Sequence, residues 1–416
     1  MKVFKFGGAS VKDAAGVKNI ANVLKQEGCD KTVVVISAMG KMTNALEEVV
    51  NSYYHKTKEI SKNLDDVKAY HEQIINELFG DKAVVTLNEI EQFYVEMTGF
   101  MMMNKSTSYN YIYDQIVSYG ELISTKIVSN YLNDFGIENQ WIDVREFIRT
   151  DRNYRDPKVD WHTTQANISE KLNINKLTIT QGFLGATEHG LTTTLGREGS
   201  DYTAAIFAYC LNAHSVTIWK DVPGVLNADP RYFKDVTLLN QISYTEAIEM
   251  AFYGASVIHP KTLKPLENKL IPLYVRSFVD ITKEGTSVSK GATLEPFVPC
   301  FIVKKNQILI SISALDFSFM VEHNISDIFK LLHDFQLKVN LIQNSAISFS
   351  VCVDDNFNNF DALLKEMDQK YKVSFDKDLT LYTIRHFDEN ALQNIEQNKE
   401  VLLKQLNKET VQIVVK

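Results

Sequence analysis

The sequence has few of the features that define several common classes of protein. Four of its 416 residues are cysteines, Cys29, Cys210, Cys300 and Cys352, and their wide spacing fits neither a disulfide framework nor a zinc site. No run of about eighteen apolar residues occurs, and the first residues lead into strand-like sequence instead of a signal peptide. We therefore expect a cytoplasmic enzyme or binding protein with no membrane segment.

Two common nucleotide-binding signatures are also absent, because the chain contains neither a Gly-x-x-x-x-Gly-Lys-Ser/Thr loop nor a Gly-x-Gly-x-x-Gly fingerprint. Its nine histidines show no His-Glu-x-x-His spacing, which argues against a protein-held transition metal. The net charge of −8, with no large cluster of Lys and Arg, argues against nucleic-acid binding. The composition, 45% hydrophobic and 23% charged, is that of an ordinary globular protein, and the length predicts two or three domains.

The most informative stretch lies at the start of the chain. Bulky residues 3–6 predict a buried strand that ends at Gly7-Gly8, and Ser10 is a candidate cap for a helix over residues 11–27. A strand, a glycine turn and a helix N-terminus expose backbone N–H groups that suit a phosphate, and Lys5 would add a positive charge. The alternative is ordinary punctuation by Gly-Gly beside a solvated lysine.

Polar side chains follow the next predicted strand, residues 32–36. Ser37, Thr43 and Asn44 come after this strand, where open α/β sheets bind ligands, although Thr43 and Asn44 could equally be helix caps. Residues 47–133 are rich in helix formers and predict a helical insertion. Within it Glu121 falls in the first turn of a helix, where a carboxylate could simply complement the helix dipole.

A second glycine-rich loop follows a predicted strand over residues 177–183. It contains Arg197, Ser200 and Asp201 and leads into a helix predicted over residues 202–211. A further strand over 215–219 precedes a loop of turn residues, 220–231. Strands alternating with helices over some 290 residues predict an α/β fold, an αβα sandwich with a mainly parallel sheet.

The pattern changes at residues 295–299. Predicted strands over 308–312, 338–342, 348–353 and 379–385, with helices over 325–335 and 360–371, follow the βαββαβ order of a ferredoxin-like α+β unit. A helix up to about residue 406 and a strand over 411–415 indicate part of a second such unit.

Two helix-opening loops in one sheet, one with Lys5 and one with Arg197 and Asp201, could hold two anionic groups facing each other. This arrangement suits phosphoryl transfer, which needs positive charge and in-line placement but little covalent chemistry from the protein.

These segments, taken together and in this order, resemble the aspartokinases. The resemblance is carried by the following segments: 5–10, 37–44, Gly120-Glu121, 182–183, 196–202, 221–231, Gly254-Ala255 with His259-Pro260, and the ACT-like C-terminal region. It covers nearly the whole chain and implies a catalytic domain over residues 1–295 with the insertion at about 47–133. It also implies an ACT-like domain over 300–378 and an abbreviated second unit over 379–416.

The implied reaction transfers the ATP γ-phosphoryl group to the β-carboxylate of L-aspartate, giving 4-phospho-L-aspartate for the synthesis of lysine, threonine and methionine. The acceptor is ionised at pH 7 and needs no general base. Residue by residue, the resemblance implies Lys5 and Asp201 as catalytic, and Ser37, Thr43, Glu121, Arg197 and Ser200 as substrate-binding. It implies Lys5, Gly7, Gly8, Ser10, Lys220, Asp221, Leu226, Asp229, Arg231 and Ser256 as ATP-binding. Mg²⁺ would be held mainly by the nucleotide, with no metal ligands assigned to the protein.

Four positions depart from the family pattern: Glu198, Lys220, Leu226 and Ser256. We hypothesise that Lys220 supplies a charge that Ser256 lacks, since many relatives have lysine at the latter position. Two alternatives remain open, a kinase of the same fold with another acceptor and a non-catalytic amino-acid or nucleotide sensor.

The C-terminal region also resembles a regulatory module. Val339, Asn340, Asn344 and Ser345 align with an effector-binding turn, which implies lysine or threonine as a possible effector and a homodimer or higher oligomer formed through this region. The alternative is that the shortened region serves dimerisation alone.

Overall fold

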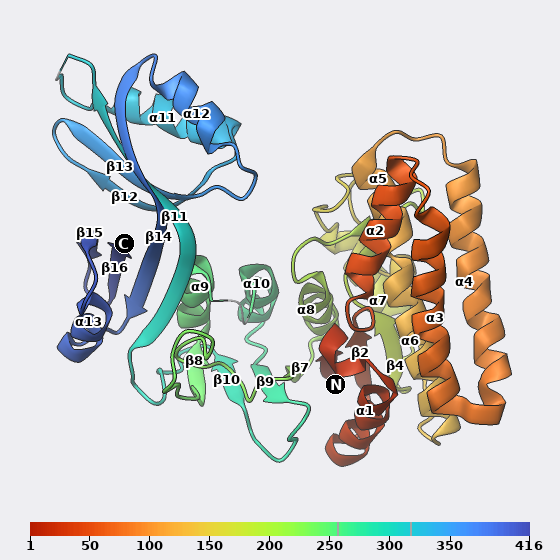
Figure 1. Cartoon of the computed structure of the whole chain (residues 1–416). Helices are drawn as coiled ribbons and strands as arrows, with labels where there is room; N and C mark the ends of the chain where they lie inside the picture. The colour runs from red at the N-terminus through yellow and green to blue at the C-terminus, as the bar shows by residue number, and fades with distance from the viewer. Residues whose placement is uncertain (256–257, 317) are drawn as a thin grey trace. The chain divides into compact units, whose positions relative to one another are not determined.

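The structure is a computed structural model that describes residues 1–255, 258–316 and 318–416. The chain divides into two compact units. In Figure 1 the residues up to 225 run from red to green, and those after 295 run from green-blue to blue. The first comprises Met1–Val225, Leu238–Ile248 and Val257–Leu294, and the second comprises Leu226–Thr237, Glu249–Ser256 and Glu295–Lys416. Each unit is described by itself below.

In the described part of the first unit, eight strands form one sheet in the order β3-β4-β2-β1-β7-β9-β10-β8. Their bounds are β1 Lys2–Phe6, β2 Thr32–Ile36, β3 Gln140–Ile142, β4 Thr178–Gln181, β7 Ser215–Lys220, β8 Gln241–Ser243, β9 Leu273–Ser277 and β10 Thr286–Ser289. The pairs are parallel except for β9 with β10. The predicted α/β sandwich with a mainly parallel sheet is therefore confirmed.

Helices cover both faces of this sheet because its central strands are apolar on both sides. All residues of β2 are buried, as expected for a strand in the middle of a parallel sheet. On one side α8 (Gly199–Leu211) packs against β1, β2 and β7, and α7 (Trp161–Lys171) and α10 (Pro260–Asn268) pack on α8. On the other side α6 (Tyr119–Asp134) contacts β2, β3 and β4, and α1 (Ala14–Glu27) contacts α6.

The first helix begins later than the sequence suggested. A short 3₁₀ helix, η1 (Gly8–Val11), follows β1, and α1 begins at Ala14. Asp13 caps α1 by accepting a hydrogen bond from the backbone N–H of Gly16 at 2.8 Å. The prediction that Ser10 is the cap is therefore wrong, because the extra 3₁₀ turn moves the helix start past it.

The predicted helical region is present as a series of helices. They are α2 Met42–Tyr54, α3 Ile60–Phe79, η2 Gly80–Lys82, α4 Ala83–Met103 and α5 Tyr109–Val117, followed by α6. The long helices α3 and α4 lie side by side (Figure 1), and buried His71 of α3 is hydrogen-bonded to the Tyr94 hydroxyl of α4 at 2.9 Å. Burial lowers the pKa of His71 to about 4, so it is a neutral core residue. None of the helices in the described part combines the length and apolarity needed to cross a bilayer.

Shorter elements connect this region to the sheet. They are the 3₁₀ helix η3 (Val144–Glu146) and the strands β5 (Leu184–Ala186) and β6 (Thr192–Thr194), which form an antiparallel hairpin. Helix α7 begins at Trp161 because Asp160 caps it by accepting a hydrogen bond from the N–H of Thr163.

The described part of the second unit contains a six-stranded antiparallel sheet in the order β12-β13-β11-β14-β16-β15. The elements are β11 Cys300–Ala314, α11 Glu322–Asp334, β12 Lys338–Asn344, β13 Ser348–Asp354, α12 Phe360–Met367, β14 Tyr371–Arg385, α13 Glu389–Glu396, β15 Val401–Leu406 and β16 Thr410–Val415. Helices α11 and α12 share an apolar core with the sheet that includes Ile310, Leu332 and Phe349. Helix α9 (Tyr244–Tyr253) contributes residues to both units.

One predicted element of this unit is wrong. Residues 401–406, expected to belong to a helix, form the edge strand β15, and the preceding helix ends at Glu396. Leu403 packs with Val414 in the core, so pairing with β16 overrides the local preference. Strand β14 also runs without a break through residue 378, joining the two ACT-like regions in one sheet.

Candidate active site

The ion pair between Lys5 and Asp201 lies at the centre of the site. Lys5 is near the carboxyl end of β1, and Asp201 is in the first turn of α8, where a carboxylate complements the helix dipole. The Lys5 Nζ lies 2.6 Å from Asp201 Oδ1, and the two residues are only 8% and 2% exposed. The two glycine-rich loops expected to cooperate are therefore brought together.

Lys220 supplies a second cation to the same carboxylate. It ends β7, which pairs directly with β1, and its Nζ lies 3.9 Å from Asp201 Oδ2. Asp201 therefore lies between two ammonium groups, one on each of its oxygens. This arrangement concentrates positive charge at the ends of two adjacent strands.

The turn after β1 is closely packed against the turn after β2. A Cβ on Gly8 would lie 2.8 Å from the carbonyl oxygens of both Ala38 and Gly40, so only glycine fits there. Ser10, in η1, is buried, and among the described residues its hydroxyl has no hydrogen-bond partner. A buried hydroxyl without a partner beside a glycine turn fits an external acceptor such as a phosphate oxygen.

Glu121 faces the end of β2 from the first turn of α6, as predicted. It is 2% exposed, its Oε1 accepts a hydrogen bond from the N–H of Ala38 at 3.3 Å, and its Oε2 has no hydrogen-bond partner within the described part of the chain. Burial without a neighbouring cation raises the pKa of Glu121 to about 8. The site therefore has a carboxyl group that a ligand's ammonium group would stabilise in its charged form.

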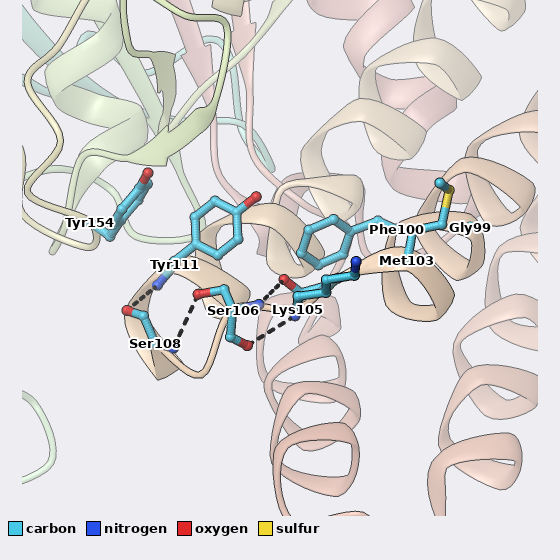
Figure 2. Close-up of a pocket in the computed structure, with 9 residues that line it drawn as sticks. Gly99, Phe100, Met103, Lys105, Ser106, Ser108, Tyr111 and Tyr154 are labelled. Atoms are coloured by element: carbon cyan, nitrogen blue, oxygen red, sulfur yellow. Dashed lines mark hydrogen bonds between the residues drawn. The ribbon is translucent and has the colours of Figure 1, made fainter.

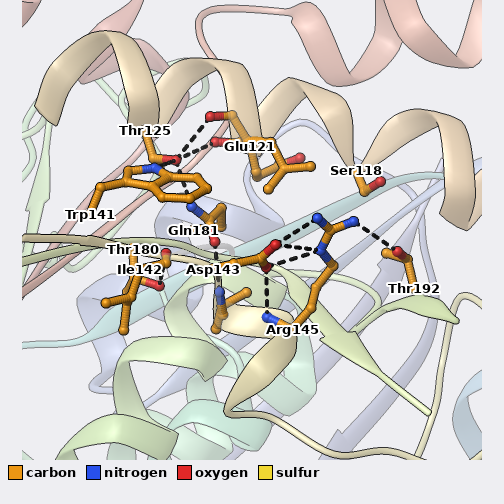
Figure 3. Close-up of polar contacts among 12 residues, drawn as sticks. Ser118, Glu121, Thr125, Trp141, Ile142, Asp143, Arg145, Thr180, Gln181 and Thr192 are labelled. Atoms are coloured by element: carbon orange, nitrogen blue, oxygen red, sulfur yellow. Dashed lines mark hydrogen bonds and ion pairs between the residues drawn. The ribbon is translucent and has the colours of Figure 1, made fainter. Parts of the chain in front are cut away.

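A polar network fixes the turn of α6 that carries Glu121 (Figure 3). The Thr125 hydroxyl donates to the Glu121 carbonyl at 2.8 Å and accepts from Gln181 Nε2 at 2.8 Å and Trp141 Nε1 at 2.9 Å. Gln181 also accepts from the N–H of Val144 at 2.8 Å. Sequence reasoning missed Gln181 and Thr125, although an amide at the end of an apolar strand was a possible signal.

The loop that carries Arg197 opens α8 from the other side of the site. A Cβ on Gly182 would lie 2.4 Å from the Ser200 Cβ, so this glycine lets the end of β4 approach the loop. Glu198 adopts a left-handed conformation with φ 53° directly before the helix. Arg197 is exposed, and among the described residues no hydrogen bond or ion pair engages its guanidinium group. It is therefore available for an anionic ligand.

Helix α10 borders the same loop. Its capping residue His259 has a pKa lowered by burial, and Glu198 and Arg197 are among the charges that act on it. Lys261 of α10 pairs with Asp156, and both lie next to Gly196.

The remaining predicted site residues are less closely connected. Ser37 follows β2, with its carbonyl accepting from the Ser124 hydroxyl at 2.8 Å, while Thr43 is half-buried in α2 and Asp221 is exposed after β7. Leu226, Asp229 and Arg231 belong to the second unit, where Asp229 and Arg231 form an ion pair with each other at 2.5 Å. Ser256 lies outside the described residues.

The predicted effector residues lie on the edge strand β12 and the turn after it. The Asn340 side chain is already engaged, because it accepts from Lys304 Nζ at 2.6 Å and donates to Gln307 Oε1 at 2.8 Å. Val339 is half-buried and Asn344 is exposed, and the exposed Ser345 hydroxyl bonds that of Ser348 at 2.7 Å.

The structure also contains a pocket that the sequence did not suggest (Figure 2). It has a volume of about 660 Å³ and lies where α4 ends and α5 begins, with Phe100, Tyr111 and Tyr154 among its lining residues. None of the predicted site residues that the structure describes lines it.

The fold and the site define the chain as a member of a class of small-molecule kinases. The sequence model of the amino acid kinase family matches residues 1–277, so the chain belongs to that family. Within the family its similarity is to the aspartokinases. It is 32% identical to lysine-sensitive aspartokinase 3 of Escherichia coli over 357 residues, covering 85% of this chain and 78% of that protein. It is 31% identical to aspartokinase 1 of Arabidopsis thaliana, covering 85% of this chain and 63% of the relative.

Solved structures agree with this assignment. The crystal structure of Escherichia coli aspartokinase III with aspartate and ADP aligns with a TM-score of 0.83 and 28% identity, covering 100% of this chain and 96% of that chain. The same enzyme with lysine and aspartate aligns equally well, at a TM-score of 0.83.

Proposed function

We propose that the chain transfers the γ-phosphoryl group of ATP to the β-carboxylate of L-aspartate, giving 4-phospho-L-aspartate, the first step towards the aspartate-derived amino acids. The observation that carries this proposal is the buried Lys5–Asp201 pair at 2.6 Å, which joins the two glycine-rich loops. The aspartokinase relatives, one of them solved with aspartate and ADP, support the choice of substrates.

The acceptor side binds aspartate through its two α-groups. Glu121 pairs with the α-ammonium group, and the exposed guanidinium of Arg197 pairs with the α-carboxylate, for which its planar fork is suited. Ser37, Thr43 and Ser200 line this pocket. The β-carboxylate is ionised at neutral pH, so the barrier is the approach of two anions and not the removal of a proton.

The phosphate side lowers that barrier with positive charge. Lys5 stabilises the phosphoryl group in transfer, Asp201 orients Lys5, and Gly7, Gly8 and Ser10 contact phosphate oxygens. The resemblance to the aspartokinases assigns Lys220, Asp221, Leu226, Asp229, Arg231 and Ser256 to the rest of the ATP site. Mg²⁺ would be held mainly by the nucleotide phosphates, as this ion often is.

The second part of the chain is proposed to regulate the first. Residues 1–295 form the catalytic domain, with the insertion at 47–133, and residues 300–378 and 379–416 form two ACT-like regions that share β14. Lysine or threonine would bind at Val339, Asn340, Asn344 and Ser345 in a cytoplasmic homodimer or larger oligomer. The relative solved with lysine favours lysine as the effector. Binding of the effector to Asn340 would either break its hydrogen bond from Lys304 or leave that bond in place.

The decisive experiment measures ADP release from ATP with L-aspartate and, separately, with L-glutamate as acceptor. Aspartate-dependent release that disappears in Lys5→Ala supports the proposal. Faster release with glutamate would indicate another acceptor, and no release with either would indicate a sensor.

A further inference from the structure

Asp114 is a buried acid that the proposed chemistry does not use. It lies on α5 with no exposed surface, and it accepts three hydrogen bonds. Its Oδ2 accepts from the backbone N–H groups of Arg155 at 3.0 Å and Thr194 at 2.9 Å, and its Oδ1 accepts from the Thr194 hydroxyl at 2.7 Å. A carboxylate suits this position because it accepts several bonds without having to donate one.

The groups joined by Asp114 flank the loop that carries Arg197. Thr194 is the last residue of β6, three residues before Arg197. On the other side, the Arg155 carbonyl oxygen lies 3.0 Å from where a Cβ on Gly196 would be, and Gly196 has φ 76°. Gly196 therefore lies next to both the Arg155 segment and the end of β6, and the hydrogen bonds of Asp114 fix the distance between these two segments.

Helix α5 holds β6 at a second point, farther from the site. Gln115, the next residue, donates to the Thr192 carbonyl at 2.8 Å and accepts from the Thr192 N–H at 3.3 Å. The helix itself begins at a serine turn (Figure 2), where the Ser108 hydroxyl accepts from the N–H of Tyr111 at 3.4 Å. Substitution of Asp114 therefore tests the contact next to the Arg197 loop, and substitution of Gln115 tests the contact at the far end of β6.

We propose that Asp114 is a positioning residue that fixes the Arg197 loop and thereby the affinity for the acceptor's α-carboxylate. The inference rests on the proposed function for its kinetic consequence, but its structural content is independent of it. The Arg155 side chain lies over the Tyr113 ring at 4.0 Å and pairs with Glu47 at 3.5 Å, and its charge also acts on Asp114. Burial raises the pKa of Asp114 to about 6, which leaves it mainly ionised at neutral pH.

The kinetic test compares Asp114→Ala, Asp114→Asn and Gln115→Ala with the unmodified protein. Asp114→Ala leaves two backbone N–H groups without an acceptor, so we expect the KM for aspartate to rise about tenfold or more, as for other small displacements of binding groups, with little change in the KM for ATP. Asp114→Asn restores aspartate affinity, because its amide oxygen can accept both N–H bonds while its NH₂ donates to Thr194. Gln115→Ala raises the KM for aspartate much less.

A double-mutant cycle tests whether the effect passes through Arg197. In the Arg197→Ala background, Asp114→Ala should add little to the KM for aspartate, because the group it positions is gone. Full additivity, or an equal rise in the KM values for ATP and aspartate, would overturn the inference. Should Asp114→Ala fail to fold, Thr194→Val removes the hydroxyl bond alone and should shift the same KM by a smaller factor.

Hydrogen–deuterium exchange separates this inference from the proposed function. Asp114→Ala should speed the exchange of amides in residues 194–199, whereas Asp114→Asn and Gln115→Ala should not. Unchanged exchange in this loop contradicts the positioning role even if the protein is an active kinase. Absence of aspartate-dependent turnover in the unmodified protein contradicts the proposed function, and the exchange result then decides the positioning role by itself.

Discussion

The proposed phosphate side and the proposed acceptor side of the site each contain a buried carboxyl group, but among the described residues only one of the two is balanced by positive charge. Asp201 has Lys5 at 2.6 Å and Lys220 at 3.9 Å. Glu121 accepts from one backbone N–H at 3.3 Å, its other oxygen has no hydrogen-bond partner among residues that the structure describes, and its pKa is raised to about 8. The phosphate side is therefore organised before a ligand binds, whereas the acceptor side is completed only by a ligand that brings its own cation.

The largest effect should come from removing the organised charge. Lys5→Ala takes away the cation closest to the phosphoryl group and leaves Asp201 with Lys220 alone, so we expect kcat to fall by roughly 10²–10³-fold, as for loss of a transition-state stabiliser. The KM for aspartate should change much less, which steady-state kinetics with each substrate varied will show. If the only change were a higher KM for aspartate, the two sides of the site would not act separately.

The next largest effect should come from the acceptor side, at Glu121. Glu121→Gln keeps the shape of the side chain but cannot carry the charge that pairs with an α-ammonium group, so the KM for aspartate should rise by about a hundredfold, as for a lost charged hydrogen bond. The KM for ATP should stay close to that of the unmodified protein. A similar rise for both substrates would contradict the assignment of Glu121 to the acceptor.

The same variant should be more stable than the unmodified protein at high pH. The pKa of Glu121 is raised in the folded state from its ordinary 4.5 to about 8, so its contribution to stability is complete below pH 4.5 and is lost as the pH rises towards 8. Glu121→Gln has no proton to lose, and its free energy of unfolding should exceed that of the unmodified protein by a few kcal/mol at pH 8.5. Urea unfolding at pH 5 and pH 8.5 measures the difference, which should nearly vanish at pH 5.

A smaller effect is expected at the second cation of the phosphate side. Lys220→Thr removes the ammonium 3.9 Å from Asp201 but keeps Lys5, so the KM for ATP should rise by about three- to tenfold, as expected for one partly exposed charge. Lys220→Arg, which keeps the charge, is the matched control. An unchanged KM for ATP in Lys220→Thr would show that Lys5 alone balances Asp201 and the nucleotide.

Many of the elements and residues in this comparison could be predicted from the sequence, and the others were missed for physical reasons. Local signals, such as the glycine turn after β1 and the position of Glu121 in a first turn, indicated the strand ends and the two loops. Gln181 and Asp114 were not found, because their roles come from hydrogen bonds to segments far along the chain. The helix cap was assigned to Ser10 instead of Asp13 because a 3₁₀ turn delays the start of the helix. Strand β15 was assigned to a helix because its pairing with β16 outweighs the local preference.

The smallest effect should come from Ser10 on the proposed phosphate side, whose buried hydroxyl, like Oε2 of Glu121, has no hydrogen-bond partner in the part of the chain that the structure describes. Ser10→Ala removes a polar group that bonds none of these residues, so the free energy of unfolding should stay the same or rise slightly. The KM for ATP should nevertheless rise by about two- to fivefold, because a phosphate oxygen loses a donor. Thermal unfolding without ATP measures the stability, steady-state kinetics measure the KM for ATP, and Ser10→Thr is the control that keeps the hydroxyl. A marked loss of stability without ATP would show that Ser10 supports the fold and that the phosphate side is complete without it.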